Sequence, residues 1–362
     1  MRENIYQPSI AIHPGKTLQD TLNVSNITQL DLAQRTGLTP KHINEIVQGK
    51  ASITTDTALK LSSVFGMSAN FWNNLQRNYE ETVTRLQMEQ ELVQEASLLS
   101  NFSCFNELVK WKYVEPACTP AEKVSRLLNF FGVSSLTFVP KVQEVAFRKS
   151  DRGRISNECI ATWLRCGELE AQRIETKEFN KEKLIAVLED LRKLTKEDPT
   201  VFQKKIIEIC GSCGVAVAFV PHFKNTCVNG MTRWLTSNKA MIQLSLRGSY
   251  DDIFWFTFFH EIGHLLKHGK KDQFVEFDKK EHKESNEKET EADDFAQNIL
   301  IPRSEFSKFY PANDFSTQAI SSFAQRINVA SGIIAGRLAH ELKDWKTWSR
   351  LRRRLKFLEK AN

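Results

Sequence analysis

The sequence predicts a mainly α-helical protein with a smaller α+β domain. Three observations support this prediction. Helix starts and stops recur at short intervals over the first ninety residues, which is typical of a helical bundle. Two β-rich apolar runs, 215–221 and 240–246, predict strands, and the helical apolar pattern of 251–268 follows them. The expected domains are therefore 1–78 (five helices), 79–198 (a helical connector) and 199–362 (the α+β domain).

The five helices of the first domain are predicted from their end residues. Ser and Thr can cap a helix start, Pro suits its first position, and Gly can end it. The expected starts are Pro14, Thr28, Thr39, Thr54 or Thr55, and Ser68, and the expected ends include Gly37 and Gly49. The Glu- and Gln-rich stretch from Asn78 to about Ser100 predicts a connecting helix.

The composition excludes several classes of protein. Of 362 residues, 41% are hydrophobic and 26% are charged, which excludes wholesale disorder. The most apolar run, 253–259, is too short to span a bilayer, and the start of the chain does not resemble a signal peptide. We therefore expect a cytoplasmic protein without membrane contact. The seven cysteines, an odd number over a long chain, favour reduced thiols.

Residues 28–50 contain two short helices about a tight glycine turn, a pattern that places the second helix in the DNA major groove. Small or apolar residues stand where such helices cross, and polar residues stand at the start of the second. An ordinary bundle without DNA contact is the alternative. The expected DNA-binding residues are Gln29, for a phosphate, and Thr39, Lys41, His42 and Asn44 on the second helix.

This segment, with its flanks to about Leu75, resembles the XRE-type helix-turn-helix repressors. The stretches I-A-I-H-P-G-K-T-L-Q-D and A-N-F-W-N-N-L-Q-R-N-Y look more narrowly like the HigA-type antitoxins. The resemblance implies a five-helix, lambda-repressor-like domain that binds a double-stranded operator as a homodimer. It also implies a small toxin protein as a candidate partner.

Residues 260–264 form the pattern H-E-x-x-H. On a helix, His260 and His264 lie one turn apart on one face, so both imidazoles can hold one Zn²⁺. Glu261 then lies beside the metal and can accept a proton from water. Two surface histidines that share this spacing by accident are the alternative.

A catalytic zinc site needs a third protein ligand. The helical pattern of 289–300 places Glu289 nearer the apolar face than Glu291, so we expect Glu289 as the ligand and Glu291 as the fallback. Asp293, one turn beyond Glu289, is expected to orient one of the histidines. His268 is a further candidate ligand, or a residue at the rim of the site.

The segments H-E-I-G-H-L-L-K-H and E-T-E-A-D-D-F-A-Q-N-I-L-I-P together resemble the ImmA/IrrE-type metallo-endopeptidases, over about 199–337. The resemblance implies a zincin-like domain, peptide-bond hydrolysis with Glu261 as general base, and a protein substrate. In zincins the substrate commonly lies along an exposed strand before the metal helix, and 240–246 is the candidate strand here.

The leading interpretation is a DNA-binding repressor, of the HigA antitoxin kind, whose zinc metallo-endopeptidase-type domain cleaves or regulates a protein partner. The alternative is a metal-dependent stress-response regulator whose peptidase-like domain is a catalytically silent sensor. Because the peptidase-like region follows a repressor domain, the sequence does not decide whether it is an active enzyme. Peptide-bond hydrolysis is the favoured interpretation.

The net charge of +6 is unevenly distributed. Residues 1–95 hold eight basic and ten acidic residues, whereas 337–362 hold nine basic and three acidic. The latter segment is expected to be a basic terminal helix that packs on the α+β core, or that contacts phosphate or an acidic partner. Its apolar stripe would consist of Leu342, Trp345, Trp348, Leu351, Leu355 and Leu358.

Overall fold

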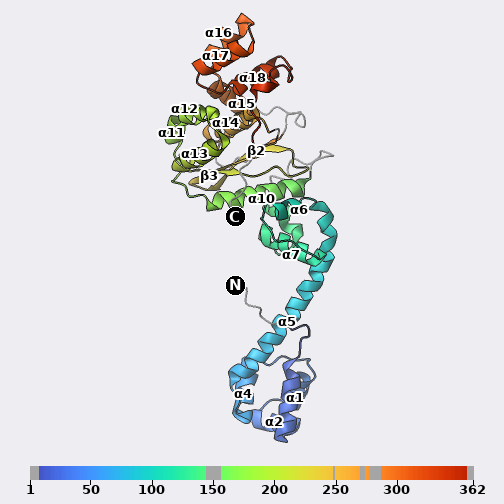
Figure 1. Ribbon diagram of the computed structural model, residues 1–362. Helices are drawn as coiled ribbons and strands as arrows, with labels where there is room; N and C mark the ends of the chain where they lie inside the picture. The colour runs from blue at the N-terminus through green and yellow to red at the C-terminus, as the bar shows by residue number, and fades with distance from the viewer. Residues whose placement is uncertain (1–7, 144–155, 248, 270–273, 278–286, 357–362) are drawn as a thin grey trace. The chain divides into compact units, whose positions relative to one another are not determined.

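The computed structural model describes residues 8–143, 156–247, 249–269, 274–277 and 287–356. The chain forms two compact units, 1–97 and 98–362. The fold class is as predicted: a helical N-terminal unit is followed by a unit in which helices surround a small sheet (Figure 1). Each unit is described by itself.

The N-terminal unit is a bundle of five helices whose starts are capped as predicted. Thr28, Thr39, Thr54 and Ser68 each accept a backbone N–H bond with the side chain, and Gly37 ends the second helix at φ +68°. The helices are α1 (Pro14–Ser25), α2 (Gln29–Thr36), α3 (Pro40–Val47), α4 (Thr55–Phe65) and α5 (Ala69–Glu95). One core of leucine, isoleucine and alanine around Trp72 joins them.

The His13-Pro14-Gly15 stretch has a structural role in this unit. The Nδ1 atom of His13 accepts a 3.0 Å bond from the Gly15 N–H at the start of α1, and its ring meets Tyr79 edge to face. A Cβ atom at Gly15 would lie 1.9 Å from the carbonyl oxygen of Ile46, so only glycine lets α1 and α3 approach this closely.

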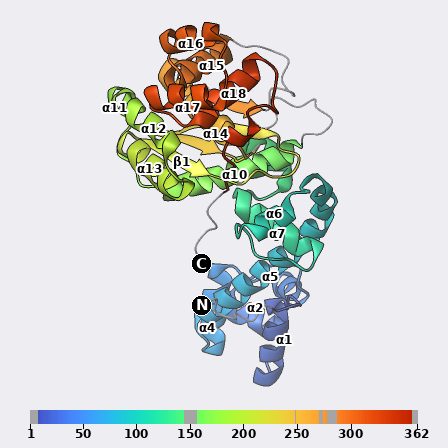
Figure 2. The same ribbon diagram turned by 45° about the horizontal axis from the view of Figure 1, so that its top comes forward.

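The second unit consists of short helices around a four-stranded sheet (Figure 2). Its strands are β1 (Val215–Phe219), β2 (Val228–Thr236), β3 (Lys239–Leu244) and β4 (Phe274–Phe277). Its α-helices are α6 (Phe105–Lys110), α7 (Pro120–Phe131), α8 (Val139–Val142), α10 (Asn157–Arg173), α11 (Lys181–Ala186), α12 (Leu188–Lys193), α13 (Pro199–Ser212), α14 (Asp251–Lys267), α15 (Glu287–Leu300), α16 (Arg303–Phe309), α17 (Thr317–Arg326) and α18 (Ser331–Glu341). Within the described ranges, no helix is both long and apolar enough to cross a membrane.

The sheet separates two layers of helices. Its strand order is β1-β3-β2-β4, with β1 parallel to β3 and the other pairs antiparallel. On one face, the side chain of Gln243 meets Gly167 of α10, while Val217 and Ile242 join the core with α13 and α14 on the other. Figure 1 shows α10 on one side of the sheet and α14 and α15 on the other.

The sheet corrects one expectation about the strands and adds two strands that were not predicted. The proposed substrate strand, 240–246, is β3, which lies between β1 and β2 and has both backbone edges paired, so it cannot accept an added strand. Strands β2 and β4 were not predicted. Strand β4 lies within the charged stretch 270–289, most of which falls outside the described residues.

The division of the chain differs from the predicted boundaries at 78 and 198. Helix α5 extends to Glu95, and residues from 98 onward belong to the second unit. The reason is the apolar face of α10, which packs on the sheet rather than connecting two domains. The indole N–H of Trp163 donates to the carbonyl of Val220, and the Gln243 amide donates to the carbonyl of Trp163.

The predicted basic C-terminal helix is wrong for the described residues. Helix α18 ends at Glu341, Lys343 adopts a left-handed φ of +53°, and the Asp344 carboxylate accepts backbone bonds from 346 and 347. Among the residues described after it, up to 356, the chain forms one 3-10 turn, Ser349–Leu351. Residues 352–355 are then held to the start of α14, and Leu358 lies outside the described residues.

Candidate metal centre and DNA interface

Helix α14 places two histidines in the interior of the second unit. It is apolar on nearly every side, which is typical of a helix buried all round. His260 and His264 lie one turn apart, and each is only 2% exposed. Buried imidazoles need polar partners, and these come mainly from the neighbouring helix α15.

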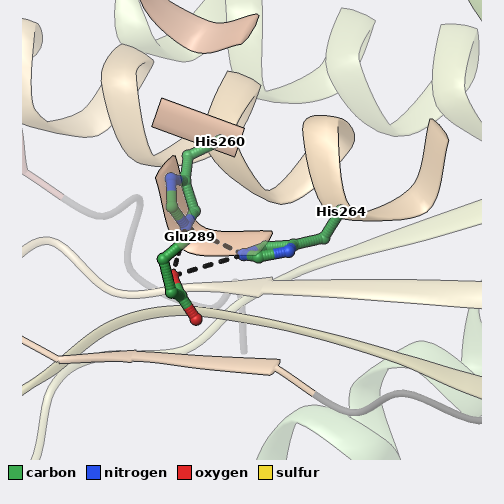
Figure 3. A group of neighbouring side chains, drawn as sticks. All are labelled: His260, His264 and Glu289. Carbon is green, nitrogen blue, oxygen red and sulfur yellow. Dashed lines mark hydrogen bonds and ion pairs between the residues drawn. The ribbon is translucent and has the colours of Figure 1, made fainter. Parts of the chain in front are cut away.

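Three side chains converge between α14 and α15. The Nε2 atoms of His260 and His264 lie 2.9 Å apart. The Oε2 atom of Glu289 lies 3.2 Å from the first and 3.5 Å from the second. Figure 3 shows the carboxylate and both imidazoles turned toward one another.

The donor set of this cluster fits a zinc ion. Two imidazole nitrogens and one carboxylate oxygen are typical ligands of catalytic zinc sites. Ligand atoms about 2.0–2.1 Å from a tetrahedral zinc lie roughly 3.4 Å from one another, close to the spacing of the cluster. Two imidazole nitrogens that face each other with lone pairs also repel unless a cation or a proton lies between them.

The protonation of the cluster favours metal binding. Burial lowers the pKa of His264, although the neighbouring Glu289 carboxylate opposes the fall. Burial acts to raise the pKa of Glu289, but the two neighbouring histidines outweigh it and hold the pKa well below its usual range. The neutral imidazole and the ionised carboxylate are the forms that bind a metal.

Each histidine has a second contact on its other ring nitrogen. The Nδ1 atom of His260 lies 2.9 Å from Oδ1 of Asp293, the residue predicted to orient a histidine. The Nδ1 atom of His264 lies 3.0 Å from Nδ1 of His268. Glu291, the fallback ligand, lies outside the cluster and contacts His268 instead.

Glycines allow the elements around the cluster to pack closely. Glu261, which is fully buried, lies against β2 at Gly230, where a Cβ atom would be 2.6 Å from the carboxylate. A Cβ at Gly263 would lie 3.1–3.2 Å from Phe295 and Ala292 of α15. The sequence made no prediction for Gly230, and its Asn-Gly pair is by itself more typical of a turn than of a strand.

The start of α14 is anchored by the basic C-terminal segment. Arg352 donates to Asp252 at 2.8 Å, and Arg353 donates to Asp251 at 3.1 Å. Burial raises the pKa of both carboxyls, and the arginines oppose the rise. Acidic residues at a helix start also interact favourably with the helix dipole. Two of the segment's arginines are therefore engaged within the unit.

The predicted DNA-binding residues lie on and beside α3 in the first unit. Ile43 and Ile46 face the core, which leaves Lys41 and Asn44 exposed on the opposite side. Lys41 is 3.9 Å from Glu45, and Asn44 accepts a bond from Gln48. These contacts lie at the surface, so both side chains can turn to another partner.

The other three predicted residues are more constrained. Thr39 is exposed, but its hydroxyl caps α3 by accepting the N–H of His42. His42 is half-buried. Gln29 stands at the first position of α2 and donates a weak 3.4 Å bond to Gln19 of α1.

Comparison with known proteins agrees with this division into two parts. A helix-turn-helix family model matches residues 25–72, and a model of the IrrE N-terminal-like domain, within the M78 peptidases, matches 249–339. The second match contains α14, α15 and all three residues of the cluster.

Several individual proteins resemble part of this chain. Virulence-associated protein I of Dichelobacter nodosus is 41% identical over 71 residues, 19% of this chain and 66% of its own length. The HTH-type transcriptional regulator YddM of Escherichia coli is 35% identical over 63 residues, 17% of this chain and 67% of its own length. Among solved structures, a HigA-family addiction module antidote protein from Coxiella burnetii has 29% sequence identity and a TM-score of 0.22. The matched region is 23% of this chain and 92% of the antidote protein's chain.

The chain thus belongs to the helix-turn-helix regulators through its N-terminal region and carries an IrrE-like peptidase domain in its C-terminal region.

Proposed function

We propose that this protein is a cytoplasmic, sequence-specific transcriptional repressor whose C-terminal unit is a zinc metallo-endopeptidase that acts on a protein partner. The convergence of His260, His264 and Glu289 beside the buried Glu261 is the observation that supports the enzymatic part most strongly. The exposed polar face of α3 after a tight glycine turn supports the DNA-binding part.

Each residue of the site would have a separate role in peptide-bond hydrolysis. His260, His264 and Glu289 would hold the zinc ion, with Asp293 orienting His260. Zinc in such a site supplies Lewis-acid activation of water and of a carbonyl group. Glu261 would accept a proton from the attacking water and pass it to the leaving amine. Its side chain is fully buried and lies against Gly230 of β2, which would shield it from bulk water.

Cleavage tests the enzymatic part. The proteins encoded by neighbouring genes would be incubated with the zinc-loaded wild type and with Glu261→Gln, which keeps the size of the side chain and removes the base. We expect cleavage by the wild type and a loss of about 10²–10⁴-fold in rate for the variant. Equal cleavage by both would remove Glu261 from catalysis.

DNA binding is tested on the promoter of the protein's own gene. Replacing Asn44 with Ala should cost about 1–3 kcal/mol of specific binding if the side chain contacts a base edge. Lys41→Ala should weaken binding to all sequences and reduce the salt dependence. Lys60→Ala is the matched control, because Lys60 lies on α4 and pairs with Asp56 there. Unchanged binding by both α3 variants would exclude this face from recognition.

The stretches that resemble HigA antitoxins motivate a more specific proposal, in which the protein is an antitoxin that represses its own operon as a homodimer. A small toxin gene beside it, whose product binds the chain, would support this role. The alternative is a catalytically silent metal sensor. In that case zinc would change operator affinity in the wild type and in Glu261→Gln alike, with cleavage by neither.

A further inference from the structure

The contacts on the far side of His264 continue beyond a single residue. Its Nδ1 atom lies 3.0 Å from Nδ1 of His268, and Nε2 of His268 lies 3.1 Å from Oε2 of Glu291. The side chain of His268 is 4% exposed, whereas that of Glu291 is 61% exposed. The chain of contacts therefore runs from the buried cluster to the surface of α15.

The chemistry of the three groups sets the direction of these hydrogen bonds. An ionised carboxylate only accepts, so His268 donates its Nε2–H to Glu291. A neutral imidazole that donates through Nε2 accepts through Nδ1, so His264 must donate its Nδ1–H to His268. The Nε2 atom of His264 then carries a lone pair, and this is the atom that faces His260 and Glu289.

We propose that His268 and Glu291 are positioning residues, which fix the ring orientation and the metal-binding tautomer of His264. This inference rests on the proposed zinc site. In this arrangement His268 and Glu291 would orient His264 in the way that Asp293 orients His260. His268 is not assigned as a fourth ligand, because its Nδ1 atom faces the nitrogen of His264 that points away from the cluster.

Zinc affinity tests the proposal on the full chain, by competition with a chromophoric chelator. His268→Leu removes both hydrogen bonds and should weaken zinc binding by about 10- to 100-fold. His268→Gln can still accept from His264 and donate to Glu291, so its affinity should stay within about a factor of three of the wild type. Lys267→Ala, an exposed neighbour on α14, is the matched control and should not change the affinity.

Because His268→Leu replaces a buried residue and could disturb folding, a variant at the exposed Glu291 provides an independent test. Glu291→Ala should weaken zinc binding by less than His268→Leu does, while Asp294→Ala, an exposed carboxylate on the same helix, should leave it unchanged. The visible spectrum of the Co²⁺-loaded protein separates support from ligation. If His268→Leu leaves the Co²⁺ absorption bands unchanged, His268 has a positioning role. If the bands shift in a way that indicates a different coordination number, His268 is a metal ligand and the positioning role is refuted.

The positioning role and the zinc site can be refuted separately. If His268→Leu and Glu291→Ala bind zinc as tightly as the wild type while His264→Ala does not bind it, the positioning role is refuted and the zinc site stands. If the wild type binds no zinc, the proposed site fails, and the positioning role fails with it.

Discussion

The buried ion pair between Arg352 and Asp252 was not predicted from the sequence. We predict that removing it destabilises the second unit. The two side chains are 5% and 10% exposed, and their closest atoms are 2.8 Å apart. Replacing Arg352 with Met keeps most of the alkyl chain and removes the charge. Asp252 is then left in a buried position without its principal cation.

The size of the effect follows from the cost of a buried, unpaired charge. Removal of one partner of such a pair costs about 3–5 kcal/mol, part of which Asp252 can avoid by taking up a proton. For a unit of this size, each kcal/mol lowers the melting temperature by about 2–4 °C, so we expect a fall of roughly 10 °C. Arg352→Met with Asp252→Asn should recover most of the loss, because the charge that lacks a partner is gone.

The assays are thermal unfolding and urea unfolding of the full chain, followed by near-ultraviolet circular dichroism and by tryptophan fluorescence. The chain forms two compact units, so we expect two transitions, of which the variant should shift only that of residues 98–362. The transition that involves Trp72, in the first unit, is the internal control. A loss below about 1 kcal/mol, or an equal shift of both transitions, would refute the reasoning.

The same variant predicts a dependence on pH. Burial raises the pKa of Asp252 above its ordinary value of 3.8, and Arg352 opposes that rise. A carboxyl whose pKa is raised on folding stabilises the fold while it is protonated, and this contribution is lost as pH rises through the folded pKa. Without Arg352 that pKa rises further, so the deficit of the variant should be larger at pH 8 than at pH 5. A deficit that grows toward acid pH would contradict this.

Three further predictions concern single sites. Gly230→Ala should destabilise the second unit by about 1–3 kcal/mol and reduce peptidase activity, because its Cβ would press on Glu261; unfolding and cleavage assays check both. Gly15→Ala should destabilise only the first unit, by at least a similar amount, because its Cβ would collide with the Ile46 carbonyl; an unshifted first transition would contradict this. Removal of metal with a chelator should lower the melting temperature of the second unit alone and zinc should restore it, as calorimetry with and without zinc would show.

Local signals predicted the helical bundle well. Its caps lie where Ser, Thr and Gly residues can form them, as at Thr28 and Gly37, and these interactions involve only neighbours in sequence. The C-terminal segment was mistaken for a helix because Trp345, Trp348 and Leu355 recur at helical spacing. Its conformation depends instead on the partners of Arg352 and Arg353 on α14, a hundred residues away in sequence.

The candidate site could be predicted where it depends on helical periodicity. The spacing of His260 and His264 and the orientation of Glu289 toward the apolar face both follow from the α-helical repeat. The contact between His268 and Glu291 depends on how α14 and α15 pack, which no local pattern specifies. The place of β3 inside the sheet likewise depends on β2, a strand that was not predicted and that contains Asn229-Gly230, a typical turn pair.

The zinc content of the purified full chain tests the central claim most directly. Elemental analysis should find about one zinc per chain in the wild type, in Glu261→Gln and in Glu291→Ala, because three protein ligands with an open position define one catalytic site. It should find close to none in His264→Ala and in Glu289→Ala. A wild type without zinc, or Glu289→Ala with undiminished zinc, would contradict the account.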